Sequence, residues 1–111
     1  FSPQSCISIK KKLAKEIFKI LKLKKFETIW LDFRIAVYYF LKNKQIYIFK
    51  KYLTYYRQLN KSASKDYKIL NKNWWYRRKQ AHEFVSFLNK KLKLKDKMNF
   101  DKIMTNIVNL L

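Results

Sequence analysis

The chain has 111 residues, with 27 lysines and arginines against 7 aspartates and glutamates, which gives a net charge of +20. It contains no glycine, which excludes a P-loop or a dinucleotide-binding fingerprint, because both need glycine at fixed positions. Hydrophobic residues make up 49% and aromatic residues 18% of the chain, so it is no disordered polyelectrolyte tail, and we expect one basic domain over residues 1–111. Because a compact body with this charge repels itself, we expect a polyanionic partner, either nucleic acid or an anionic membrane.

Apolar residues recur at helical spacing along the chain, and no convincing stretch alternates with a period of two. Residues 1–8 are an expected irregular lead-in, and Ser8 is the predicted N-cap of a first helix over about 9–24. A second helix is predicted over about 27–42 and a third over about 45–59. The apolar face of the first helix comprises Ile9, Leu13, Ile17, Ile20 and Leu21. The apolar face of the second comprises Trp30, Phe33, Val37, Phe40 and Leu41. The apolar face of the third comprises Ile46, Phe49, Leu53 and Tyr56.

Residues 60–64 are polar and small, which predicts a loop that ends at Ser64, the expected cap of a fourth helix. A fifth helix is predicted over about 80–95, followed by a loop at 95–99. Asn99 is the predicted cap of the last helix, whose apolar stripe comprises Phe100, Ile103, Met104, Ile107 and Leu111. The fold class is therefore all-α, with five or six short amphipathic helices in a small bundle or an extended arrangement that becomes ordered within a larger assembly.

Residues suited to catalysis are few. His82 is the only histidine, so no zinc site with two histidines can form within one chain. Cys6 is the only cysteine, and it lies in the lead-in, so a Cys6–His82 nucleophile pair has no supporting signature. The acidic residues are scattered among lysines, as expected of ion-pair partners. We predict that the protein is not an enzyme and uses no cofactor or metal ion.

Two lysine clusters are candidate binding surfaces. The first places eight lysines within residues 10–25, where Glu16 is the sole acid, and the second spans residues 90–97, where Asp96 is the sole acid. Such a cluster could bind an RNA phosphate backbone. It could also belong to an amphipathic helix that lies on an anionic bilayer. The third interpretation is a helix face that is only solvated. We expect lysines all around the first helix, which favours RNA. The predicted RNA-binding lysines here are Lys10, Lys11, Lys12, Lys15, Lys19, Lys22, Lys24, Lys25, Lys90, Lys91, Lys93 and Lys95.

The segment 74–79 combines three adjacent aromatic residues with half of the four arginines. Successive helical residues turn by about 100°, so at least one of the three rings should point outward. Guanidinium groups bind phosphate through two parallel hydrogen bonds, and aromatic rings stack on unpaired bases. The alternative is a core or protein-interface role for the tryptophans. The predicted RNA-binding residues of this segment are Trp75, Tyr76, Arg77, Arg78 and Lys79, with the two arginines expected to matter more than any two lysines of residues 10–25.

These features lead to a hypothesis of a structural RNA-binding component of a large ribonucleoprotein that contacts structured RNA, such as ribosomal RNA, and neighbouring proteins. Lysine, asparagine, isoleucine, phenylalanine and tyrosine are abundant and have AT-rich codons. This bias favours a ribosomal protein from an AT-rich lineage. Codon drift in such a lineage is also an alternative explanation for the lysine excess. The chain begins at Phe1, which fits import into an organelle, and we expect the mitochondrial matrix rather than secretion. The alternative is an accessory helical subunit of a respiratory or ATP synthase-type membrane complex that contacts anionic lipid. A helical inhibitor or immunity-type protein is a third possibility.

Overall fold

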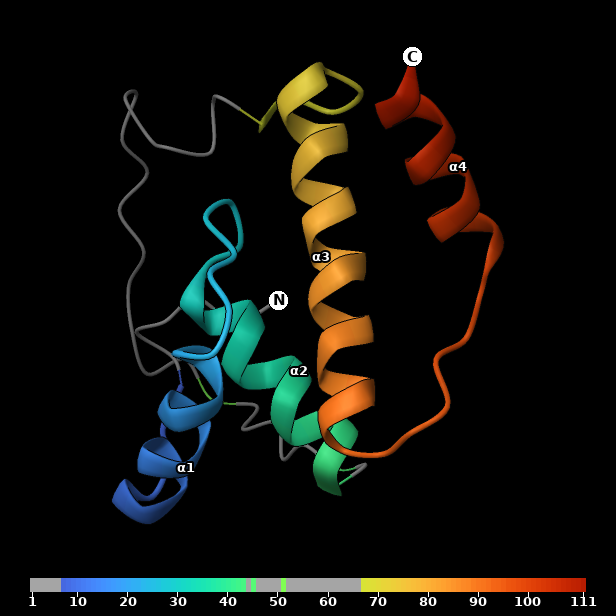
Figure 1. Ribbon diagram of the computed structural model, residues 1–111. Helices are drawn as coiled ribbons and strands as arrows, with labels where there is room; N and C mark the ends of the chain where they lie inside the picture. The colour runs from blue at the N-terminus through green and yellow to red at the C-terminus, as the bar shows by residue number, and fades with distance from the viewer. Residues whose placement is uncertain (1–6, 44, 46–50, 52–66) are drawn as a thin grey trace. The chain divides into compact units, whose positions relative to one another are not determined.

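The structure is a computed structural model that describes residues 7–43, 45, 51 and 67–111 (Figure 1). These residues contain four α-helices and no strand, which confirms the all-α class, while the expected count of five or six is too high for this part of the chain. The predicted loop at 60–64 and the Ser64 cap lie outside the described residues. The third predicted helix also lies outside them, except for residues 45 and 51. The chain divides into two compact units, Phe1–Tyr55 and Tyr56–Leu111, which are described separately.

The first unit contains α1 (Lys11–Leu21) and α2 (Leu31–Asn43). α1 begins after Lys10, which has extended backbone angles and makes no capping hydrogen bond through its side chain, so the predicted Ser8 cap is wrong. Ile17 is fully buried on the predicted apolar face of α1. Among the described residues of this unit, the buried apolar side chains are Ile17, Phe26, Ile29, Ile35 and Tyr38.

α2 buries a different face from the one predicted. Ile35 and Tyr38 are buried, whereas Trp30, just before the helix, and Phe40 are exposed. The reason is that α2 carries apolar residues on nearly all sides, so periodicity alone does not select the face that packs. Asp32 is also buried; its carboxylate accepts a hydrogen bond of 2.8 Å from the Phe33 backbone amide, in the first turn where a helix favours negative charge.

The second unit contains α3 (Lys72–Lys91) and α4 (Phe100–Leu110), which lie side by side and antiparallel (Figure 1). α3 replaces the predicted fourth and fifth helices, because residues 72–91 include no glycine or proline that would end a helix. Asn71 is the N-cap of α3, and its side-chain oxygen accepts a hydrogen bond of 2.7 Å from the Trp74 amide.

Both ends of the connection between α3 and α4 have defined caps. After α3, the backbone amide of Leu94 donates to the Asn89 carbonyl at 2.8 Å and that of Lys93 donates to the Lys90 carbonyl at 3.4 Å. This pair of bonds is a Schellman motif, and it requires a left-handed residue, here Lys93 with φ of 55°. At the start of α4, the Asn99 side chain accepts a hydrogen bond of 2.8 Å from the Lys102 amide, which confirms Asn99 as the cap.

The packing of α4 differs from the prediction. Phe84 and Leu88 of α3 are fully buried, yet the buried residue of α4 is Thr105. The predicted apolar stripe of α4 is largely exposed, with Phe100 77% exposed and Ile107 47% exposed. The stripe therefore does not form the core face of this unit, although Met104 is half-buried; the hydrogen bonds and ion pair between α4 and α3 come from polar side chains of α4.

Candidate nucleic-acid interface

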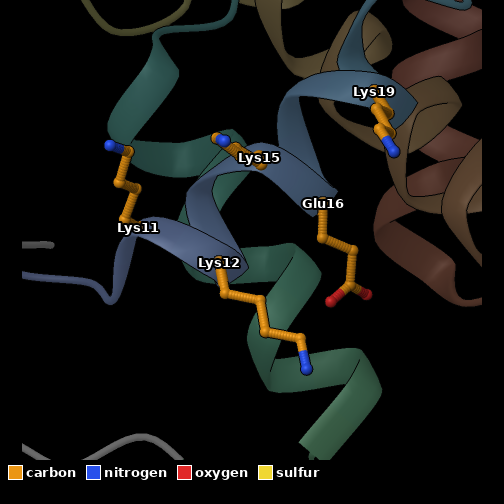
Figure 2. A pocket seen from close by; sticks show the side chains of 5 residues that line it. All are labelled: Lys11, Lys12, Lys15, Glu16 and Lys19. Carbon is orange, nitrogen blue, oxygen red and sulfur yellow. The ribbon is translucent and has the colours of Figure 1, made fainter.

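The outward face of α1 carries the clearest cluster of like charge in the first unit. Four of the lysines of residues 10–25, together with Glu16, line one shallow open hollow of about 640 Å³. Figure 2 shows these side chains extending away from the helix. The lining residues are Lys11, Lys12, Lys15, Glu16 and Lys19, and all four lysines are exposed.

The lysine spacing follows directly from helix geometry. Lys11, Lys15 and Lys19 are four residues apart, so they form a row with about 6 Å between neighbours along the axis. Ile17 and its apolar neighbours occupy the opposite side of α1 and are turned into the unit. The expectation of lysines all around the first helix is therefore wrong for α1, whose lysines gather on one side.

Glu16, the acid within this cluster, is held by residues of α2. Its carboxylate accepts a hydrogen bond of 2.5 Å from the Tyr38 hydroxyl and forms an ion pair with Lys42. The bond to Lys42, and then that to Tyr38, lowers the pKa of Glu16. Burial, followed by the bond to Glu16, raises the pKa of Tyr38. The negative charge of Glu16 is thus offset mainly by Lys42 of α2, with a smaller contribution from Lys12.

The remaining lysines of residues 10–25 precede or follow α1 in the sequence. Lys10 precedes the helix and Lys22 follows it as the C-cap. The Lys24 ammonium lies 5.2 Å from the centre of the Phe26 ring. The exposed lysines of this group are Lys10, Lys22, Lys24 and Lys25.

The segment 74–79 lies in the first part of α3. The Trp74 and Trp75 rings meet edge to face, with centroids 4.8 Å apart, and both side chains are half-buried. Tyr76 is 48% exposed, which confirms that one of the three rings points outward. Its hydroxyl accepts a hydrogen bond of 3.0 Å from the Gln80 side chain.

The two arginines of this segment make contacts within the second unit. Arg78 donates from Nη2 at 2.5 Å and from Nε at 2.9 Å to the same oxygen of Asp101, and its guanidinium lies 4.9 Å from the Trp74 ring centre. The Arg77 guanidinium lies 4.8 Å from the Tyr67 ring centre. Arg78 therefore joins α3 to α4, a role that its sequence neighbourhood did not suggest because Asp101 is 23 residues away.

Asp101 also contacts His82, whose Nε2 lies 2.6 Å from the second carboxylate oxygen. The bond to Arg78, followed by the weaker effect of His82, lowers the pKa of Asp101 against the opposing effect of burial. The sole histidine thus contributes to helix packing. Cys6, its hypothetical catalytic partner, lies outside the described residues.

The second lysine cluster lies at the end of α3 and in the following connection. Its members Lys90, Lys91, Lys93 and Lys95 are exposed, while Lys79 is half-buried nearer the start of α3. Asp96, the acid of this cluster, pairs at 2.7 Å with Lys102 of α4. Hydrogen bonds from Lys102 and Ser86 lower the pKa of Asp96 to about 2.

The described residues hold no group of three His, Cys, Asp or Glu side chains placed to bind a metal ion. Within the same residues, no helix has the length and apolar character needed to cross a membrane. Comparison with protein families, with curated proteins and with solved structures found no match to this chain. The candidate interface is therefore argued from geometry and charge alone.

Proposed function

We propose that the protein is a non-enzymatic structural component of a large ribonucleoprotein and that the exposed lysine face of α1 binds an RNA phosphate backbone. The observation that carries the proposal is that α1 exposes Lys11, Lys12, Lys15 and Lys19 while its apolar side is already packed within the first unit. Each lysine that neutralises a phosphate releases condensed counterions, so a row of them gains affinity without base-specific contacts.

The packing of α1 supports RNA over an inserted amphipathic helix at this surface. Insertion into a bilayer needs an accessible apolar face. Ile17 is fully buried, and the Tyr39 hydroxyl donates a hydrogen bond of 2.5 Å to the Leu13 carbonyl, so the apolar side of α1 is already engaged within the first unit. The exposed side is mainly cationic, which suits attraction to phosphate without burial in hydrocarbon.

The particle in this proposal is a ribosome of an AT-rich lineage, in the mitochondrial matrix. Its support is the composition: residues with AT-rich codons dominate, and the net charge of +20 calls for a polyanion. The exposed lysines Lys90, Lys91, Lys93 and Lys95 at the end of α3 provide a second surface for RNA, and Tyr76 and Arg77, near the start of the same helix, provide further contacts. Arg78 contributes by holding α4 on α3.

The alternative function is an accessory subunit of a membrane-associated complex that touches anionic lipid. The observation that favours it is the one-sided arrangement of lysines on α1, since a single cationic edge also suits lipid headgroups. Sedimentation of the native protein from a detergent-cleared lysate separates the two functions. Ribonuclease should dissolve the particle if it is a ribonucleoprotein, and a large particle indifferent to ribonuclease favours the membrane complex.

The binding surface itself is tested with two variants of equal charge. Lys11→Gln/Lys15→Gln removes two lysines from the α1 row, whereas Lys68→Gln/Lys72→Gln removes two exposed lysines from the second unit. Binding of a structured RNA is measured across a range of salt concentrations. The first variant should reduce the steepness of the log–log salt dependence by roughly 1.4 to 1.8, since each phosphate contact contributes about 0.7 to 0.9.

The control variant should leave this slope close to that of the unchanged protein. Equal losses in both variants mean that bulk charge rather than the α1 face binds RNA. A salt-independent affinity contradicts the proposal altogether.

A further inference from the structure

α4 has its polar side turned toward α3 and its apolar side turned outward. Its hydrogen bonds and ion pair with α3 are made by Asp101, Lys102 and Asn109. Asp101 pairs with Arg78, Lys102 donates to the Ser86 hydroxyl at 2.7 Å, and the Asn109 side chain donates to the Trp75 carbonyl at 3.0 Å. Thr105, on the same side, is fully buried. This arrangement is the reverse of an ordinary surface helix, which buries its apolar stripe.

The outward side of α4 is a continuous apolar ridge, which we call the α4 ridge. Its residues recur at spacings of three and four, so they lie along one side of the helix. Phe100 and Leu110, near its two ends, are 77% and 84% exposed. The α4 ridge comprises Phe100, Ile103, Ile107, Leu110 and Leu111, and Met98 is exposed just before it.

The net charge near the α4 ridge is positive. Residues 92–111 include two acids, Asp96 and Asp101, and each is paired with a cation of the second unit. The segment that leads into α4 carries Lys93, Lys95 and Lys97, all exposed. An occupant of this surface must therefore accept apolar side chains and bring negative charge beside them.

We propose that the α4 ridge docks on the surface of an anionic bilayer, with α4 lying in the interface and the lysines of residues 93–97 at the headgroups. A polar side turned into the protein and an apolar side turned outward is the arrangement that a hydrocarbon environment stabilises. α4 is about 16 Å long, roughly half of a bilayer's hydrocarbon core, so it lies along the interface and does not span it. A second copy is a poor occupant, because each copy carries +20.

The inference does not depend on the RNA proposal, because the lysine face of α1 carries that proposal and lies on a different helix from the α4 ridge. Lys93 and Lys95, which the RNA proposal assigns to a second RNA surface, contact headgroups instead in the membrane-bound protein. Apolar side chains of an interfacial helix enter the boundary between headgroups and acyl chains, and anionic lipids add electrostatic attraction. Any protein of this charge binds anionic vesicles through lysines alone. The test must therefore detect insertion of the α4 ridge and not binding in general.

The experiment uses the full chain with Cys6→Ser and one new cysteine, labelled with an environment-sensitive fluorophore. Ile107→Cys places the fluorophore on the α4 ridge, and Asn106→Cys, its exposed neighbour, places it about 100° away around the helix. Vesicles of phosphatidylcholine mixed with phosphatidylglycerol should shift the emission of the fluorophore at 107 to the blue and leave that at 106 nearly unchanged. Vesicles of phosphatidylcholine alone should give a much smaller shift at 107.

A substitution then measures the contribution of the ridge. Ile107→Asn should lower the vesicle partition coefficient roughly tenfold or more, as expected for removing one aliphatic side chain from hydrocarbon. Asn106→Ser is the matched control and should change it little. Circular dichroism of each variant checks that helix content is retained, and RNA binding by the Ile107→Asn variant should persist, so failure of this inference is distinct from failure of the RNA proposal.

Three outcomes overturn the inference. Vesicle binding with a water-like emission at 107 means that lysines alone hold the protein at the surface. A fluorophore at 107 that is already shielded from water in the free protein means that the protein itself covers the ridge. The covering segment belongs to a second copy if shielding increases with protein concentration, and to the same chain if it does not. Shielding at 107 by an acidic amphipathic peptide, without any effect of anionic vesicles, assigns the ridge to a protein partner.

Discussion

Lys93 occupies the position where helices most often place glycine, and the chain has no glycine to place there. Its φ of 55° lies in the left-handed region, where the β-carbon of an L-amino acid crowds the following carbonyl oxygen. The Schellman bonds from Lys93 to Lys90 and from Leu94 to Asn89 hold it in this conformation. Lys93→Gly should therefore stabilise the second unit.

The magnitude follows from two opposing effects. A left-handed conformation costs a residue with a β-carbon about 1–2 kcal/mol, and glycine removes this cost. Glycine also loses about 0.5–1 kcal/mol more conformational free energy on folding than a residue with a side chain. The net expectation for Lys93→Gly is a free energy of unfolding higher by about 0.5–1 kcal/mol.

Lys95→Gly is a closely matched control. It lies two residues away in the same exposed connection and removes the same charge, but its φ is not positive. It should lower the free energy of unfolding by about 0.5–1 kcal/mol through glycine's entropy alone. The two variants should thus differ in opposite directions from the unchanged protein, by about 1–2 kcal/mol from each other.

Urea unfolding followed by circular dichroism, with tryptophan fluorescence as a second probe, measures both variants. Trp74 and Trp75 report on the second unit, and Trp30 reports on the first. Equal shifts of the two variants in the same direction would refute the reasoning, because the left-handed geometry would then contribute nothing measurable.

Two other properties of the second unit can be tested in the same way. The pKa of Asp96 is lowered from 3.8 to about 2, so its stabilising contribution should be complete above about pH 5 and should be lost as the pH falls through 2. Asp96→Asn should remove this part of the acid sensitivity in urea titrations at each pH. The hydroxyl of Thr105 is buried and has no hydrogen-bond partner among the described residues, so Thr105→Val should raise the free energy of unfolding by about 1 kcal/mol, whereas a loss of stability would reveal an unseen partner.

The all-α class, the Asn99 cap and the buried Ile17 were predictable from sequence. Each depends on residues within one or two helical turns. Helical periodicity identifies apolar stripes, and an asparagine before a helix supplies an acceptor to backbone amides that lie three residues ahead. The lysine row of α1 was likewise identifiable in the sequence, although its confinement to one side of the helix was not predicted.

Tertiary structure decided which apolar stripes are buried. α2 carries apolar residues on nearly all sides, and its buried pair, Ile35 and Tyr38, was chosen by the surface that packs against it. α4 has a clear apolar stripe, yet its polar side faces α3 because Arg78 and His82 engage Asp101 there. Sequence periodicity indicates that a helix has an apolar and a polar side, but it does not indicate which side packs against the neighbouring helix.

The pairing of Arg78 with Asp101 and of Glu16 with Tyr38 also belongs to tertiary structure, since the partners are 23 and 22 residues apart. Local sequence determined where helices form and where lysines gather, because those features depend on neighbouring residues. Contacts between helices decided which charges are paired inside a unit and which apolar surface remains for a partner. The reason is that no local pattern specifies the residue that a side chain meets across a helix interface.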